Sequence, residues 1–174
     1  SYQPKEHKIS IYISNVALVV DCLDLWVSFS KRISTIYLPD RKRPMLPSML
    51  VDCLCSLKEK ENKLCYVLDI FYDEHNTIIK QKLGLCKAYI SKNYDYNNAC
   101  FSNNNPYFQE ICKILQINNP KQIVTRLMLH FNHYVARELS NYKKGVFKTL
   151  FQEKDESVSL KIPTEVHNHI CIIK

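Results

Sequence analysis

The sequence predicts an α+β fold in which helices cover one face of a mainly antiparallel sheet. Three observations lead to this prediction. Ile9, Ile11 and Ile13 alternate with polar or semi-polar residues, which is the period of a strand. Two later apolar runs flank a short polar turn, and a long amphipathic stretch comes after them. At 174 residues the chain has the length of one domain, taken here as residues 1–174.

The first part of the chain is expected to begin with a strand. That strand covers residues 8–20, and residues 21–34 are amphipathic and fit either a helix or a strand. Three prolines between Pro39 and Pro47 exclude a regular helix or a central strand there. A short helix is expected to follow, over 48–57.

A hairpin is expected next, with strands at 64–73 and 77–92 around an Asp-Glu-His-Asn turn. The asparagine-rich residues 97–105 predict a loop, and residues 107–117 predict a helix. The tail, 157–174, contains two short strand-like runs.

A second helix is expected to begin at Asn119 and Pro120, because asparagine is a favourable N-cap and proline a favourable first helical residue. Gly145 fits its C-terminal stop. The apolar residues repeat with a period of 3.6, at Ile123, Val124, Leu127, Met128, Phe131, Tyr134, Val135 and Leu139.

Composition excludes several classes of protein. The chain has only 2 glycines, so it has neither a P-loop nor a glycine-rich dinucleotide-binding loop. It lacks an apolar run long enough for a transmembrane helix, and we expect no membrane contact. The formal net charge of +7 favours an anionic partner, of which nucleic acid is the commonest.

The 8 cysteines lack the spacing of a zinc site, and most lie in apolar runs. We interpret them as reduced core residues, which predicts an intracellular, reducing compartment, the cytoplasm or an organelle. The pairs His130/His133 and His167/His169 lack a nearby carboxylate or cysteine to complete a metal site. No metal ligand is therefore assigned.

The proline-rich segment is the strongest candidate for binding. Tyr37 can stack on a base, and Arg41, Lys42 and Arg43 can hold phosphates. These four residues are the first candidates for contact with a nucleic acid. The alternative is a rigid surface loop that only joins two elements.

The same segment carries a family resemblance. The runs YLPDR, PMLP and LCSL within residues 37–57 closely resemble the RNB catalytic domain of ribonuclease II, ribonuclease R and the exosome catalytic subunit. Three weaker landmarks are similar in the expected order: YISNV at 12–16, YDY at 94–96 and VTRLMLHFN at 124–132. Together they cover about residues 9–150, as a single truncated RNB-like domain.

The resemblance implies a processive 3′→5′ exoribonuclease that uses Mg²⁺ and releases nucleoside monophosphates. It implies that Tyr37 packs against the 3′-terminal end of the RNA. It also implies that Tyr96 lines the RNA channel, which adds a fifth candidate RNA-binding residue.

The departures from the family concern the catalytic centre. Asn15 replaces a family aspartate and Thr125 a family glutamate, and the family's aspartate cluster precedes the first strand seen here. Metal-dependent phosphodiester hydrolysis needs several converging carboxylates. The remaining pairs, Asp21/Asp24 and Asp69/Asp73, are interpreted as solvated surface. We therefore expect no catalytic residue in this chain and no cofactor bound by this chain alone. Mg²⁺ is expected to bind only in an active assembly that supplies the carboxylates.

Three hypotheses remain. The chain is a degenerate RNB-like domain kept for RNA binding or as a scaffold in a ribonucleoprotein or nuclease assembly. It is a fragment or subunit of an active exoribonuclease whose aspartate cluster lies elsewhere. Or it is an unrelated α+β interaction protein. A truncated domain exposes surface, so a protein partner that covers this surface is also expected.

Overall fold

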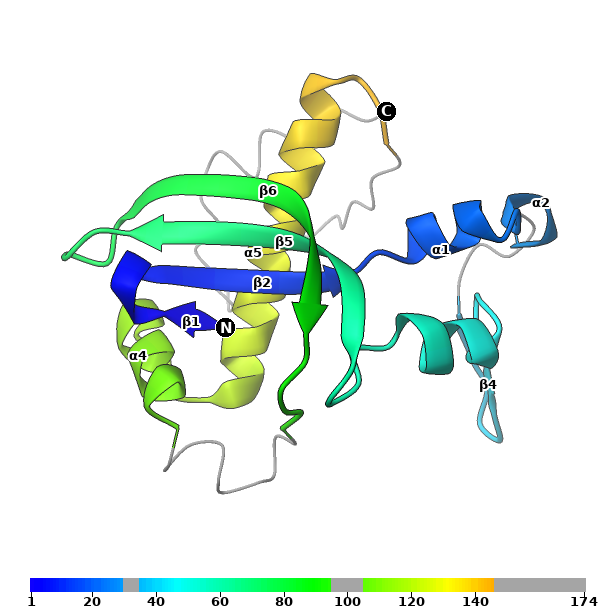
Figure 1. Ribbon diagram of the computed structural model, residues 1–174, viewed down its shortest axis with the longest axis horizontal. Coiled ribbons are helices and arrows are strands. Elements are labelled where there is room, and N and C mark those ends of the chain that lie inside the picture. The colour runs from blue at the N-terminus through cyan, green and yellow to red at the C-terminus, as the bar shows by residue number, and fades with distance from the viewer. Residues whose placement is uncertain (30–34, 95–104, 146–174) are drawn as a thin grey trace, which may run out of the picture. The chain divides into compact units, whose positions relative to one another are not determined.

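The computed structural model describes residues 1–29, 35–94 and 105–145. The chain divides into two compact units, Ser1–Ile123 and Val124–Lys174. The first unit contains the sheet and most of the helices (Figure 1). No helix among the described residues is both long and apolar enough to cross a membrane.

The main sheet has four antiparallel strands in the order β1-β2-β5-β6. Their bounds are Tyr2–Gln3, Lys8–Ser14, Asn62–Tyr72 and Ile78–Tyr89. A short 3-10 helix, η1 (Pro4–Glu6), joins the first two strands. This sheet confirms the predicted α+β class and the predicted hairpin.

The turn between β5 and β6 is built by one side chain. The Asp73 carboxylate accepts hydrogen bonds from the backbone amides of His75 at 2.9 Å and Thr77 at 2.7 Å. Asn76 takes the left-handed conformation, with φ of 60°, which asparagine tolerates better than most residues. Local chemistry therefore fixes this hairpin.

Alternating side chains of β5 form the centre of the sheet's core. Leu68, Ile70 and Tyr72 are buried, and Ile9 of β2 lies opposite Ile70. At this end of the sheet, helix α4 (Pro106–Leu115) lies against β1 and is capped by the Asn105 side chain.

The predicted strand over residues 8–20 is wrong in its second half. Strand β2 ends at Ser14, and α1 (Val16–Cys22) follows. The Asn15 side chain caps this helix by accepting a hydrogen bond from the Leu18 amide at 3.1 Å. Val20 is buried beside Leu50 and Cys55, so packing outweighs the strand preference of the valines.

Two further helices accompany α1 beyond the end of the sheet (Figure 1). They are α2 (Trp26–Phe29) and η2 (Met49–Cys55). The short helix expected over 48–57 is therefore present, but as a π-helix. Its wider turns are visible in the bond from the Ser56 amide to the Val51 carbonyl, five residues back, at 2.8 Å.

Helix α5 (Pro120–Asn141) begins where the sequence predicts, with the Asn119 side chain accepting from the Lys121 amide at 2.9 Å. It ends before Gly145. Lys143 makes the left-handed turn, with φ of 52°, and donates its amide to the Ser140 carbonyl at 2.9 Å. The loop predicted at 97–105 lies outside the described residues except for Asn105, and the strands predicted within 157–174 lie outside them entirely.

The prediction that the cysteines are reduced core residues is confirmed only in part. All six described cysteines are free thiols. Cys55 and Cys65 are buried, and burial raises the pKa of both thiols. Cys22 and Cys53 are exposed, so the interpretation as core residues is wrong for these two.

Candidate nucleic-acid interface

The proline-rich segment folds as a small two-stranded ribbon that is separate from the main sheet. Its strands are β3 (Ile36–Tyr37) and β4 (Lys42–Arg43). The Leu38 amide donates to the Arg41 carbonyl at 2.9 Å and closes the turn that carries Pro39. Proline fixes its own backbone torsion, so this turn is locally stiff.

Tyr37 stands on the ribbon with 77% of its surface exposed. Lys42 lies directly opposite in the strand register, and its Nζ is 5.8 Å from the centre of the tyrosine ring. A lysine at that distance has a favourable cation–π contact with a ring face. The pair places an aromatic surface for stacking beside a cation that can meet the phosphate of a stacked nucleotide.

Three consecutive cations, Arg41, Lys42 and Arg43, are exposed on the same ribbon. Arg41 has an ion pair with Asp40 at 3.7 Å, but 61% of the Arg41 side chain is exposed. An ion pair in that setting is worth about 0–1 kcal/mol, so the guanidinium remains available to a phosphate. The ribbon thus brings together four of the five predicted RNA-binding residues; the fifth, Tyr96, lies outside the described residues.

Asn15 occupies the junction between β2 and α1. It is 4% exposed, its side chain caps α1, and its backbone amide donates to the Leu64 carbonyl of β5 at 2.9 Å. A neutral amide meets this capping need as well as a carboxylate does. Thr125 lies in the first turns of α5.

The carboxylates that the structure describes do not converge on one point. Asp21 accepts a hydrogen bond from the indole of Trp26, and Asp73 holds the hairpin turn. The interpretation of Asp69 as solvated surface is wrong, because it accepts from Ser10 Oγ at 2.5 Å and pairs with Lys8 Nζ at 3.5 Å. Among the described residues no three metal-ligating side chains gather. These donors do not fit a Mg²⁺ site, which requires several oxygen ligands around one point.

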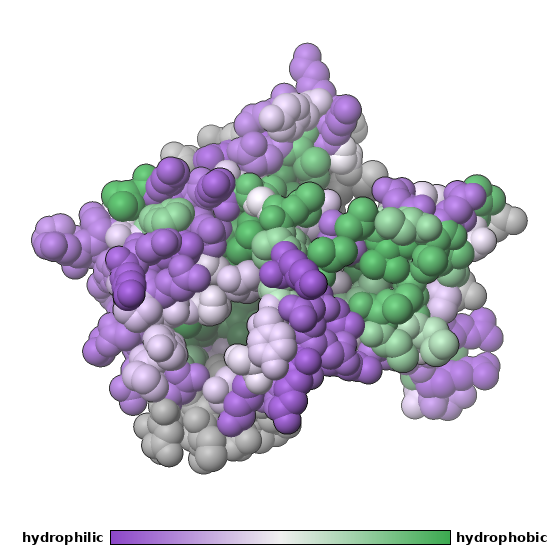
Figure 2. Space-filling model, in the orientation of Figure 1, coloured by the Kyte–Doolittle hydropathy of each residue, from purple (hydrophilic) through white to green (hydrophobic). Residues whose placement is uncertain are grey.

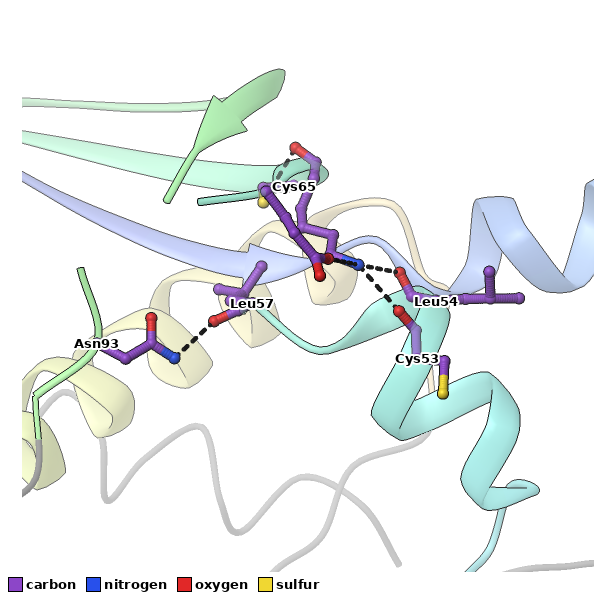
Figure 3. A network of polar contacts seen from close by, with 7 residues as sticks. Cys53, Leu54, Leu57, Cys65 and Asn93 are labelled. Carbon is purple, nitrogen blue, oxygen red and sulfur yellow. Dashed lines mark hydrogen bonds and ion pairs between the residues drawn. The ribbon is translucent and has the colours of Figure 1, made fainter. Parts of the chain in front are cut away.

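Sequence reasoning missed a network that joins the helices to the sheet (Figure 3). Lys63 of β5, with only 10% of its side chain exposed, donates to the carbonyls of Cys53 at 3.0 Å and Leu54 at 3.1 Å. Its ammonium also pairs with Glu61 at 2.7 Å. The network therefore gives the end of η2 a cationic cap, the charge that a helix C-terminus favours.

The segment after β6 carries a second aromatic contact that sequence reasoning did not nominate. Lys92 Nζ lies 5.1 Å from the centre of the Tyr94 ring. Asn93 holds the segment in place, because its side-chain amide donates to the Leu57 carbonyl at 3.0 Å. The predicted YDY landmark begins at Tyr94, so its signal was present in the sequence.

Comparison with known proteins identifies the family. The model of the RNB domain matches residues 1–105, more than half of the chain. The protein therefore belongs to the RNB domain family. The match begins earlier than the expected span of about 9–150, and it stops before the landmark in α5. A comparison with curated proteins gives no match.

A solved enzyme structure shares the fold of this chain. Mycoplasma genitalium RNase R in complex with double-stranded RNA is 22% identical, with a TM-score of 0.65 over 82% of this chain and 34% of that chain. The same enzyme with ribose-methylated single-stranded RNA is 21% identical, with a TM-score of 0.49 over 88% of this chain and 23% of that one. The chain thus spans about a third of the RNase R chain in the first of these structures.

Proposed function

We propose that this RNB-family domain binds single-stranded RNA through the β3–β4 ribbon and has no hydrolytic activity on its own. Its role is that of an RNA-binding or scaffolding part of a ribonucleoprotein or nuclease assembly. The single observation that carries the proposal is the exposed Tyr37 ring with Lys42 opposite it and two arginines on the same ribbon. The RNA in the first RNase R complex supports the choice of RNA as the ligand.

Each part of the ribbon has a defined task in this proposal. A base stacked on Tyr37 contributes about 1–3 kcal/mol and needs no particular sequence. Arg41 and Arg43 contact phosphates, which makes the affinity dependent on salt. Arginine suits this task because its planar fork matches two phosphate oxygens.

The proposed lack of hydrolysis is based on the side chains that could bind a metal ion. Asn15 brings no charge, and Asp69 and Asp73 are each engaged in a structural hydrogen bond. No step of a Mg²⁺-dependent reaction is assigned to these residues. The proposal also includes a protein partner and, from the free thiols, a reducing compartment.

A second candidate is that the chain is part of an active Mg²⁺-dependent 3′→5′ exoribonuclease whose carboxylates lie outside residues 1–174. Family membership, together with coverage of 34% of the RNase R chain, favours this candidate. The two candidates differ in what the 174-residue chain does alone.

The test is an RNA assay in two modes. One measures degradation of a 3′-labelled single strand with Mg²⁺, and the other measures binding of that strand across a salt series. We expect no turnover and salt-sensitive binding. Metal-dependent turnover by the purified chain would overturn the non-hydrolytic part of the proposal.

The variant Arg41→Ala with Arg43→Ala tests the surface. The slope of log K for RNA binding against log salt concentration should become shallower by about 0.7 for each phosphate that the protein no longer neutralises. The matched control, Lys80→Ala with Lys82→Ala, removes the same charge from β6 and should leave the slope unchanged. An unchanged slope in the arginine variant would mean that the ribbon does not face RNA.

A further inference from the structure

The three helices beyond the sheet form a module with little core of its own. We define the helical module as residues 16–29 and 45–57, which contain α1, α2 and η2. Its buried residues are Val20, Leu50 and Cys55, and five partly buried apolar side chains pack against them. Three buried residues supply little of the burial on which a stable packed unit depends.

Half of the module's large apolar side chains are exposed. Figure 2 shows this apolar surface gathered over α1 and η2. Val27 is 81% exposed and Met49 is 75% exposed, the highest values among them. The other exposed members are Leu18, Leu23, Trp26, Met45, Val51 and Leu54. A contiguous apolar surface of this kind marks an interaction site.

The charge of the module sets it apart from the rest of the protein. Its only charged residues are Asp21, Asp24 and Asp52, all exposed, although the whole chain carries a formal net charge of +7. Aspartates repel the phosphates of RNA and of anionic lipid surfaces. They attract lysine and arginine side chains, so the charge selects a basic polypeptide.

We propose that the helical module is a docking surface for a protein partner that presents an apolar helix flanked by lysine or arginine. The apolar face of that helix covers Met49, Leu54 and their neighbours, and its cations meet the three aspartates. In recognition of an amphipathic helix by an apolar surface, burial gives affinity and the charges at the rim give specificity. The inference rests on the proposed scaffold role, and it is independent of RNA binding.

The test uses Trp26, the chain's single tryptophan, which is 52% exposed on this surface. The probe is a synthetic amphipathic peptide of about 18 residues, long enough to form a helix, with a leucine face and lysine flanks. We expect saturable binding and a blue shift of tryptophan emission as the indole leaves water. A second peptide, with glutamate in place of each lysine, should bind more weakly at low salt.

Substitutions locate the site. Met49→Asp should weaken peptide binding by about tenfold or more, because it places a charge where the bound peptide would bury an apolar side chain. The matched control is Ile79→Asp on β6, where the original residue is also exposed, at 67%. The Ile79→Asp variant should bind the peptide with the same affinity as the unaltered protein. Asp52→Lys should weaken binding of the basic peptide and strengthen binding of the acidic one.

Three results would overturn the proposal. One is the absence of any tryptophan shift with the basic peptide. Another is equal binding of the basic and acidic peptides at low salt. The third is self-association in sedimentation that Met49→Asp abolishes, because the occupant would then be a second copy of the chain. Loss of RNA binding in Tyr37→Ala with intact peptide binding leaves this proposal standing, so the two proposals fail separately.

Discussion

The four-stranded sheet has a larger buried core than the helical module, although Ile79, Leu85 and Tyr89 of β6 are exposed. In the sheet, every residue of β2 pairs with β5, and Ile9, Leu68, Ile70 and Cys65 are less than 2% exposed. In the module, three residues are buried and eight large apolar side chains are exposed. The sheet therefore supplies the largest share of the buried core of the first unit, whereas both proposed binding surfaces lie outside it, on the module and on the β3–β4 ribbon.

The largest expected effect comes from the core of the sheet. Leu68 is fully buried, so Leu68→Ala should lower the free energy of unfolding by about 2–5 kcal/mol. Urea unfolding followed by circular dichroism measures this change. Leu85→Ala, at a position 67% exposed, should change the stability by about 0.5 kcal/mol or less. Equal losses in both variants would contradict the assignment of stability to this core.

The next effect separates binding from stability. Tyr37→Ala should weaken binding of single-stranded RNA by about 1–3 kcal/mol while urea unfolding stays the same, because the ring is exposed. Tyr107→Ala is the matched control, since Tyr107 is also exposed, at 53%. Fluorescence anisotropy with a labelled strand gives the affinities. Equal weakening by both variants would show that the ribbon has no special part in binding.

A smaller effect is expected where the two regions join. Asn15→Ala removes the cap of α1 and should cost about 1 kcal/mol in the free energy of unfolding, whereas Asn15→Asp should retain the cap. Chemical denaturation measures both variants. Because the nearby carboxylates do not converge, Asn15→Asp should also acquire no Mg²⁺-dependent RNA degradation. RNA degradation by the Asn15→Asp variant would show that the absence of one carboxylate, at position 15, is what prevents hydrolysis by this chain.

The smallest expected effect depends on pH and lies in the sheet. The hydrogen bond from Lys8 to Glu6, and the charge of Asp69, raise the pKa of the Lys8 ammonium above 10.5. A raised pKa of a cation means that its stabilisation is complete below the unfolded value and is lost as the pH rises through the folded value. Stability should therefore fall above about pH 10.5 by a small amount. The urea midpoints of Lys8→Met should show a shallower fall over the same range.

Local chemistry explains which parts of the fold could be predicted from the sequence. The hairpin and the start of α5 depend on Asp73 and Asn119, whose partners lie within four residues. The sequence pattern alone does not predict the helix at Val16–Cys22, although Asn15 is a favourable N-cap, because valines favour strands and the outcome depends on packing against Leu50. Such a contact between distant segments has no local signal.

The candidate site divides in the same way. Tyr37 and its neighbouring cations could be identified because one short segment carries them all. The role of Lys63 could not be identified, because its partners are backbone carbonyls nine and ten residues away. Every residue has a backbone carbonyl, so the sequence does not indicate which one a side chain will bind. Asp69 was misread for a related reason, since its partner Ser10 lies on another strand.

The contact between Lys63 and η2 has a consequence for how the protein can evolve. The ammonium binds the main chain at Cys53 and Leu54, so the bond does not depend on which side chains occupy those positions. Substitutions on the outer face of η2 can accumulate while its attachment to β5 is kept. The exposed apolar surface of the module can thus change in sequence more freely than the buried core of the sheet that supports it.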